Sequence, residues 1–143
     1  MLSLFFALSF ATGAVGQPRE TLAINTGDGE RHVFRVEIAR TPEQQATGLM
    51  FRERIAEDVG MLFLYSRESF QAMWMKNTLI SLDILFIKRD GRIHHIHERA
   101  IPGSLTTISS RGRILAVLEL KGGTVARLGI QKGNLVEYPA LRK

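Results

Sequence analysis

The sequence predicts a mainly β protein, either an antiparallel β-sandwich or an open barrel, with two short helices. Short runs of strand-forming residues follow one another, and Gly, Asp and Asn turn residues separate them at short intervals. Only two brief segments carry helix signals, which argues against a fold that alternates strands with long helices. The chain has 143 residues, of which 45% are hydrophobic, and this suits one domain with its own core.

The first predicted supersecondary unit is a hairpin. Residues 21–24 and 32–39 are β-type segments, and a turn-rich cluster at 25–29 separates them. In the second segment Phe34, Val36 and Ile38 share one face, while Arg35 and Glu37 share the other. This alternation indicates a strand with one buried face and one polar face.

Helix signals occur at two places. Thr41 and Gln44 fit a capping box and Pro42 fits the first helical position, so a short helix is expected over 42–48. Residues 122–124 can start a second helix of one or two turns, which Gly129 ends.

Further strands are predicted, so that the chain has about eight short strands in all. The expected segments are 60–65, 84–87, 92–98, 115–120 and 135–138. The first two are continuous apolar runs, which suit strands covered on both faces. The dipeptide Asp90-Gly91 between two strand-like runs is a strong hairpin signal.

The N-terminal residues 1–16 resemble a secretory signal peptide. They contain no charged side chain and end in Ala14, Val15 and Gly16, the small residues of a cleavage site, although a basic start is missing. Their apolar part is shorter than the roughly 20 residues that a membrane-spanning helix needs. The alternatives are an uncleaved anchor or an N-terminal core strand. We therefore expect residues 17–143 to form a single β-rich domain, periplasmic or secreted, with no transmembrane segment in the mature chain.

The composition argues against several functional classes. The 19 basic and 14 acidic side chains give a formal net charge of +5, but they are scattered, so no nucleic-acid surface is indicated. Because the chain has no Cys, it has no disulfide, thiol nucleophile or zinc–thiolate site. It also lacks a Walker loop, a dinucleotide fingerprint and a Gly-x-Ser-x-Gly elbow, so no cofactor is predicted.

The most informative polar residue is Lys76, which follows the chain's only Trp by two positions. If 70–76 is extended, Phe70, Ala72, Trp74 and Lys76 share one face, and Met73 and Met75 share the other. A Lys at the end of such a row either extends into solvent or is held inside by a carboxylate.

Two carboxylates are candidates for that partner. Glu119 falls in the otherwise apolar strand 115–120 and needs a cation if it is buried, and Asp83 is the alternative. The hypothesis is one polar cluster of Lys76 and Asn77 with Asp83 or Glu119, with Arg52 close enough to contribute charge.

Metal binding is not predicted. His95 and His97 point to one face of a strand and His94 to the other, so only two imidazoles converge. Thioethers prefer Cu(I), but Met73 and Met75 would face away from Trp74 in a strand. The remaining methionines, Met50 and Met61, are most simply core residues.

Several strings in the chain resemble the domain of unknown function 192 family. They are 48–52 (GLMFR), 60–63 (GMLF), 74–83 (WMKNTLISLD) and 118–120 (LEL), with Gly122, Gly123 and Gly129. The resemblance covers about residues 31 to 138 and implies an exported, single-domain, β-rich protein. The family motif maps onto Arg52, Trp74, Met75, Lys76, Asn77, Asp83 and Glu119. The chain departs from it at Ser81, where Pro is usual, and at Ser104, where many members carry Cys.

These observations leave three classes of function open. The first is a module that binds a small molecule or an envelope component in a polar pocket formed by the seven motif residues. The second is a hydrolase-like enzyme with Glu119 or Asp83 as general base and Lys76 or Arg52 stabilising negative charge. The third is a structural or partner-binding domain whose motif only maintains the fold.

Overall fold

In residues 17–141, which the computed structural model describes, seven strands form one sheet in the order β5-β4-β6-β3-β2-β1-β7. The predicted signal peptide at 1–16 lies outside the described residues. The strands are β1 (Arg19–Asn25), β2 (Arg31–Ala39), β3 (Val59–Met73), β4 (Leu82–Ile87), β5 (Ile93–Ala100), β6 (Ile108–Lys121) and β7 (Leu135–Glu137). Two short helices, α1 (Pro42–Thr47) and α2 (Thr124–Leu128), and a 3-10 turn, η1 (Pro139–Leu141), complete the described part.

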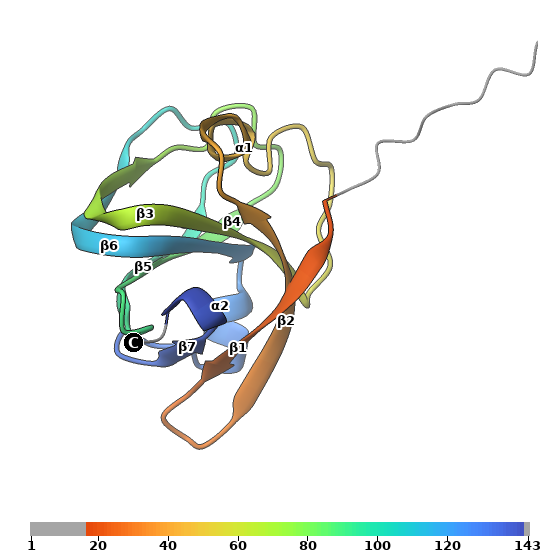
Figure 1. Ribbon diagram of the computed structural model, residues 1–143. Helices are drawn as coiled ribbons and strands as arrows, with labels where there is room; N and C mark the ends of the chain where they lie inside the picture. The colour runs from red at the N-terminus through yellow and green to blue at the C-terminus, as the bar shows by residue number, and fades with distance from the viewer. Residues whose placement is uncertain (1–16, 142–143) are drawn as a thin grey trace, which may run out of the picture.

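The sheet curls into an open barrel, with α1 at one end and α2 near β1, β2 and β7 at the other (Figure 1). The two edges meet where residues 91–93 lie against residues 133–136. Arg92 and Leu135 form an antiparallel bridge, the Val136 amide donates to the Gly91 carbonyl at 2.8 Å, and the Ile93 amide donates to the Asn134 carbonyl at 3.0 Å. The predicted mainly β fold with two short helices is therefore confirmed in its open-barrel form.

The pairing of β2 with β3 is parallel, whereas the other strand pairs are antiparallel. The expected antiparallel arrangement holds for the other pairs, and the β2–β3 pair departs from it. A parallel pair needs a crossover of a dozen or more residues, and residues 40–58, including α1, supply it. The number of strands is also lower than predicted, since β3 and β6 are long and continue through register shifts.

Both predicted helices form where their end signals lie. Thr41 Oγ1 accepts a hydrogen bond from the Gln44 amide at 3.1 Å, and Gln44 Oε1 accepts one from the Thr41 amide at 3.1 Å, so the capping box is complete. Gly129 ends α2 in the left-handed conformation, with φ of 66°.

The central strands β3, β4 and β6 are covered on both faces. One apolar cluster fills the inside of the barrel and includes Leu22, Val36, Leu118 and Val125. A second cluster covers the outer face and includes Met61, Phe63, Ile84, Phe86 and Val117. This is why the predicted strands 60–65 and 84–87 are continuous apolar runs rather than alternating ones. Among residues 17–141, no helix is long and apolar enough to cross a membrane.

Candidate functional site

Glu119 is a carboxylic acid inside the outer apolar cluster. It is 4% exposed and lies in β6 between Met61 of β3 and Ile84 of β4, its cross-strand neighbours. Within residues 17–141 its side chain makes no hydrogen bond and no ion pair. Burial raises the pKa of Glu119 to about 8, so the carboxyl group holds its proton at neutral pH.

Glu119 lies in the wall of a cavity of about 300 Å³. The other walls come from α1 and the residues after it, from β3, and from the loop at 74–78. The side chains that matter chemically are aromatic, thioether and amide groups: Gln45, Met50, Tyr65, Gln71, Met73 and Trp74. The cavity thus combines an apolar lining with a few polar groups, as small-ligand sites do.

Tyr65 is the second titratable group in this cavity. Burial, and secondarily the charge of Glu119, raise the pKa of the Tyr65 phenol. Its hydroxyl lies 3.9 Å from Met73 Sδ. The phenol therefore stays protonated over the whole working pH range and can donate a hydrogen bond into the cavity.

Trp74 lines this cavity, and Lys76 lies over the Trp74 ring. Trp74 is 47% exposed, and Lys76 Nζ lies 5.0 Å from the centre of its ring. Phe70, Ala72, Trp74 and Lys76 do share one side of the segment, as predicted, but that side faces solvent. Among the described residues Lys76 makes no ion pair with Asp83, Glu119 or any other carboxylate, so the predicted cluster around Lys76 is wrong. A solvated Lys needs no buried partner.

Met75 and Asn77 lie outside the cavity of Glu119. Met75 is completely buried and lines a different cavity, of about 340 Å³, together with His95 and His97. Asn77 is exposed, with φ of 53°; its carbonyl accepts a hydrogen bond from the Phe51 amide at 2.8 Å. Neither side chain lines the cavity of Glu119.

Asp83 points to the opposite face of the sheet from Glu119. Asp83 pairs with Leu120 and Ile84 pairs with Glu119, and consecutive residues of a strand point to opposite faces. The Asp83 carboxylate accepts hydrogen bonds from the amides of Val125 and Arg99, each at 2.8 Å, and of Gly123 at 3.2 Å. It therefore fixes α2 against β4 and plays no part in the cavity.

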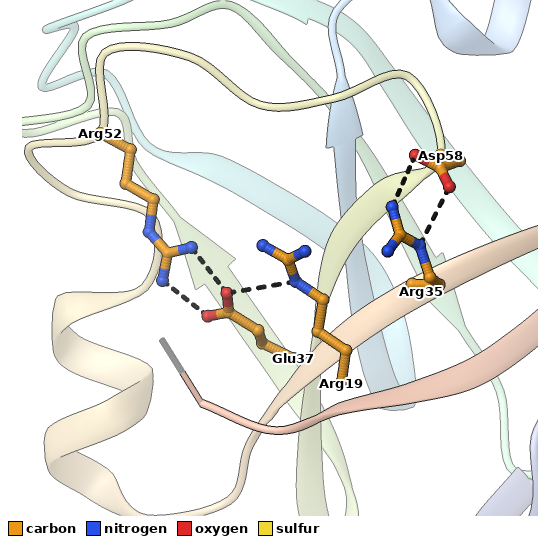
Figure 2. Close-up of polar contacts among 5 residues, drawn as sticks. All are labelled: Arg19, Arg35, Glu37, Arg52 and Asp58. Atoms are coloured by element: carbon orange, nitrogen blue, oxygen red, sulfur yellow. Dashed lines mark hydrogen bonds and ion pairs between the residues drawn. The ribbon is translucent and has the colours of Figure 1, made fainter. Parts of the chain in front are cut away.

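Arg52 is bound to a carboxylate that the sequence analysis placed on a polar face. Arg52 donates two hydrogen bonds to Glu37, of 2.7 and 2.6 Å, and Arg19 Nε lies 3.8 Å from the same carboxylate (Figure 2). Glu37 is 1% exposed, so its predicted solvent-facing position is wrong. The crossover at 40–58 covers this part of β2, which alternation within one strand does not reveal.

The histidines of β5 do not form a metal centre in the described structure. His95 stacks on Phe86 with ring centroids 5.7 Å apart, and burial and then neighbouring positive charges lower the pKa of His95. His94 Nε2 lies 3.2 Å from the Arg111 carbonyl oxygen. No group of three or more His, Cys, Asp or Glu residues within 17–141 could hold a metal. The expectation that the fold needs no metal stays a prediction.

One cross-strand row organises the outer face. Arg19, Glu37, Met61, Glu119, Ile84 and His97 are successive register partners across β1, β2, β3, β6, β4 and β5. Side chains that are paired in this way share one face of a sheet. The cavities beside Arg19, Glu119 and His97 therefore all lie on this face, whereas apolar side chains fill the inner face.

Fold and site together define a single-domain, open-barrel protein with a buried carboxylic acid in a small cavity. Residues 23–138 match the model of the domain of unknown function 192 (DUF192) family, which is described as "Uncharacterized ACR". The chain belongs to this family. A comparison with curated proteins finds no significant match.

Two solved structures have the same fold at high sequence identity. A suggested transcription regulator from Sinorhizobium meliloti 1021 is 45% identical, with a TM-score of 0.84, and the match covers 87% of this chain and 97% of that one. A protein of unknown function from Novosphingobium aromaticivorans DSM 12444 is 42% identical, with a TM-score of 0.83, covering 87% of this chain and 89% of that one.

Proposed function

We propose that this protein binds a small organic ligand in the cavity of Glu119, and that the ligand carries an ammonium group. The observation that carries the proposal is the state of Glu119, which is 4% exposed and makes no hydrogen bond or ion pair within residues 17–141. A buried polar group without a partner costs the fold stability. A ligand that supplies the partner recovers that free energy as binding.

Among possible partners, a cation gains the most binding free energy from this carboxyl group. Burial alone disfavours the ionised form of Glu119, and a positive charge placed beside it reverses that preference. Tyr65 and Trp74 in the same wall add aromatic faces, which attract ammonium groups. The position of Lys76 Nζ, 5.0 Å from the Trp74 ring centre, is consistent with that affinity.

The size of the cavity sets the size of the ligand. A volume of about 300 Å³ is at the lower end of the range for small-molecule sites, roughly 300–1,000 Å³. Its amide and thioether walls, Gln45, Gln71, Met50 and Met73, suit a short polar or aliphatic amine better than an extended polymer.

The test is a thermal-shift screen of amines against neutral compounds of the same shape. We expect amines to raise the melting temperature, since a ligand at about one hundred times its Kd adds roughly 2.7 kcal/mol. Glu119→Gln should abolish the shift, whereas Glu98→Gln, which changes an exposed carboxylate, should retain it. Equal shifts from amines and neutral analogues, or an unchanged shift in Glu119→Gln, would rule out the proposal. Native mass spectrometry of freshly purified protein would show a retained ligand directly.

General acid–base catalysis is a second candidate function, and the pKa of Glu119 favours it. A catalytic acid or base works best when its pKa lies near the working pH, and the value of about 8 satisfies this. The arrangement with Lys76 and Asp83 does not support it, because neither residue lines the cavity. If the protein converts a bound amine and Glu119→Gln loses this activity, the protein is an enzyme rather than a binding module.

We further propose that the protein is exported and works in the periplasm or outside the cell. The uncharged apolar residues 1–16 and the small residues at 14–16 support this. Intact-mass measurement on protein from an exporting host should give a chain that begins near Gln17. A full-length cytoplasmic product would contradict the proposal.

The description of the Sinorhizobium meliloti relative makes nucleic acid a necessary control. We expect no saturable binding of duplex DNA at physiological salt, because the sequence has no basic run interleaved with aromatic residues. Salt-resistant, sequence-dependent binding would favour a regulatory role for this chain as well.

A further inference from the structure

Four arginines line one cavity on the outer face of the sheet. Arg19 comes from β1, Arg35 from β2, and Arg52 and Arg54 from the crossover at 40–58. The cavity has a volume of about 310 Å³ and shares no lining residue with the cavity of Glu119. Its remaining wall is apolar and consists of Ile55, Ala56 and Val59.

Two of the guanidinium groups are fixed in place by carboxylates. Arg52 forms a two-pronged contact with buried Glu37, at 2.7 and 2.6 Å. Arg35 contacts Asp58 in the same way, at 3.0 and 3.3 Å, and Figure 2 shows both pairs. Each guanidinium carries five N–H donors, so each keeps three that these bonds do not use. Both ion pairs therefore leave N–H donors unused, and buried Glu37 also holds Arg52 in position.

The other two arginines have no hydrogen-bond partner among the described residues. Arg19 approaches Glu37 only to 3.8 Å, beyond hydrogen-bond distance, and its side chain is 41% exposed. Arg54 makes no hydrogen bond or ion pair within residues 17–141. Glu53 lies between Arg52 and Arg54 in the chain but is not part of the wall. Four guanidinium groups thus face two carboxylates, which leaves an excess of two positive charges.

We propose that this cavity, hereafter the arginine cavity, is a binding site for a phosphate group. Planar guanidinium groups pair with phosphate oxygens through two parallel hydrogen bonds, and such charge-assisted bonds are strong. Four arginines from three segments around one hollow match a tetrahedral anion better than a single surface Arg does.

This site differs from the proposed amine site in both location and charge. The arginine cavity lies over β1, β2 and the start of β3, whereas Glu119 lies beyond Met61 in β6. An experiment that disproves binding at one site does not bear on binding at the other site. The phosphate belongs either to a soluble phosphorylated compound or to the headgroup of an anionic phospholipid, and the two share the chemistry that the arginines recognise.

The test uses residues 17–143 of the chain with inorganic phosphate as the probe and NMR of the arginine Nε–Hε groups as the readout. Saturable shifts are expected at Arg19, Arg35 and Arg54 and at the amides of Ile55 and Ala56. The double variant Arg19→Gln/Arg54→Gln should bind phosphate at least about tenfold more weakly, because it removes the two guanidinium groups that make no hydrogen bond within residues 17–141. It leaves the Arg52–Glu37 pair intact, so folding is preserved.

The matched control is Arg67→Gln/Arg89→Gln, which removes the same charge from two exposed residues outside the cavity. It should bind phosphate like the unchanged chain. A second arm distinguishes a lipid headgroup from a soluble phosphorylated compound with vesicles of phosphatidylcholine, prepared with and without phosphatidylglycerol. Co-sedimentation that depends on Arg19 and Arg54 indicates a lipid headgroup. Saturable binding in either arm, lost only in the cavity variant, supports the site. Equal loss in both variants, or no saturable binding in either arm, overturns it.

Discussion

Two buried glutamates on the outer face of the sheet differ in whether they have a hydrogen-bond partner. Glu37 is 1% exposed and receives two hydrogen bonds from Arg52, whereas Glu119 is 4% exposed and receives none within residues 17–141. Met61 separates them in the cross-strand row. The first arrangement is complete without a ligand, and the second is not. This contrast indicates a structural role for the Arg52–Glu37 pair and is the basis of the binding role that we propose for Glu119.

The Arg52–Glu37 pair gives a prediction about stability. Removing one partner of a buried ion pair costs up to about 3–5 kcal/mol. Arg52→Met should cost less than that, because the Arg52 side chain is 34% exposed and Arg19 lies 3.8 Å from the same carboxylate. Urea unfolding would measure the loss.

The double variant Arg52→Met/Glu37→Met provides the control for that prediction. It should recover much of the lost free energy, because no buried charge is then left without a partner. A double-mutant cycle with a coupling energy near zero would show that the pair contributes nothing to stability.

Glu119 gives a prediction about pH. Its folded-state pKa is about 8 against an ordinary value of 4.5, so between these values the folded state binds more protons than the unfolded state. The contribution of Glu119 to stability must therefore fall as pH rises through this window and be constant outside it, where this group has the same protonation in both states. The total loss is on the order of a few kcal/mol.

Glu119→Gln should remove this pH dependence, because Gln does not titrate. Urea unfolding at several pH values, with Glu98→Gln as the control for an exposed carboxylate, would measure it. If Glu119→Gln loses stability between pH 4.5 and 8 as steeply as the unchanged chain, another group is responsible for the effect.

At the scale of elements, Asp83 links the end of the sheet to α2. Its hydrogen bonds from the amides of Gly123 and Val125 stand in for a side-chain cap, which α2 itself lacks, and a third bond comes from the Arg99 amide in β5. Asp83→Asn keeps the shape of the side chain but replaces one acceptor oxygen by an amide donor. We expect a loss of about 1–3 kcal/mol, the cost of leaving one buried backbone amide unsatisfied.

Hydrogen exchange at the Val125 amide should rise in Asp83→Asn before exchange in β3 and β6 does. Asp90→Asn is the matched control, since Asp90 is exposed and its one hydrogen bond, to the Arg92 amide, suits an Asn equally well. It should change stability by less than about 0.5 kcal/mol. A large loss in the control, or none in Asp83→Asn, would refute this role of Asp83.

Most of the elements could be predicted from local pattern, because their causes are local. The hairpin of β1 and β2, the capping box at Thr41 and Gln44, and the turn at Asp90-Gly91 depend on neighbours a few residues apart. The parallel pairing of β2 with β3 could not be predicted in this way, since it depends on the path of the crossover at 40–58. The solvent-facing position of Lys76 could not be predicted either, because alternation separates the two faces of a strand but does not identify the buried one.

The candidate site was predictable only in part, for a similar reason. Glu119 stood out as a charge in an apolar strand, and Trp74 lines the same cavity. Tyr65 could have been added, because it alternates with Met61 and Phe63, the outer-face neighbours of the Glu119 strand. Gln45 and Met50 carry no such signal: they reach the cavity because α1 packs over it.

At the scale of the whole molecule, the barrel is filled on the inside and carries cavities on the outside. Apolar packing fills the interior, and the three cavities on the outer face interrupt the packing that covers it. Stability therefore comes from packing, with no disulfide to assist it.

This view predicts that folding does not depend on a metal. Extensive chelation should leave the melting temperature unchanged, because the binding energy of a structural metal would be part of the folding free energy. A large drop would contradict this, and re-addition of single metals would then identify the ion. The first place to look would be the cavity lined by His95 and His97.

The central claim is that Glu119 is an unpaired acid whose partner is a ligand cation, and carboxyl-carbon NMR of Glu119 during a pH titration tests it most directly. In the free protein the carboxyl group should titrate near pH 8. With a bound amine from the screen it should stay ionised to well below that pH, because the ammonium group stabilises the charge. Titration of the free protein near the ordinary value of 4.5, or a pKa that no amine changes, would contradict the claim.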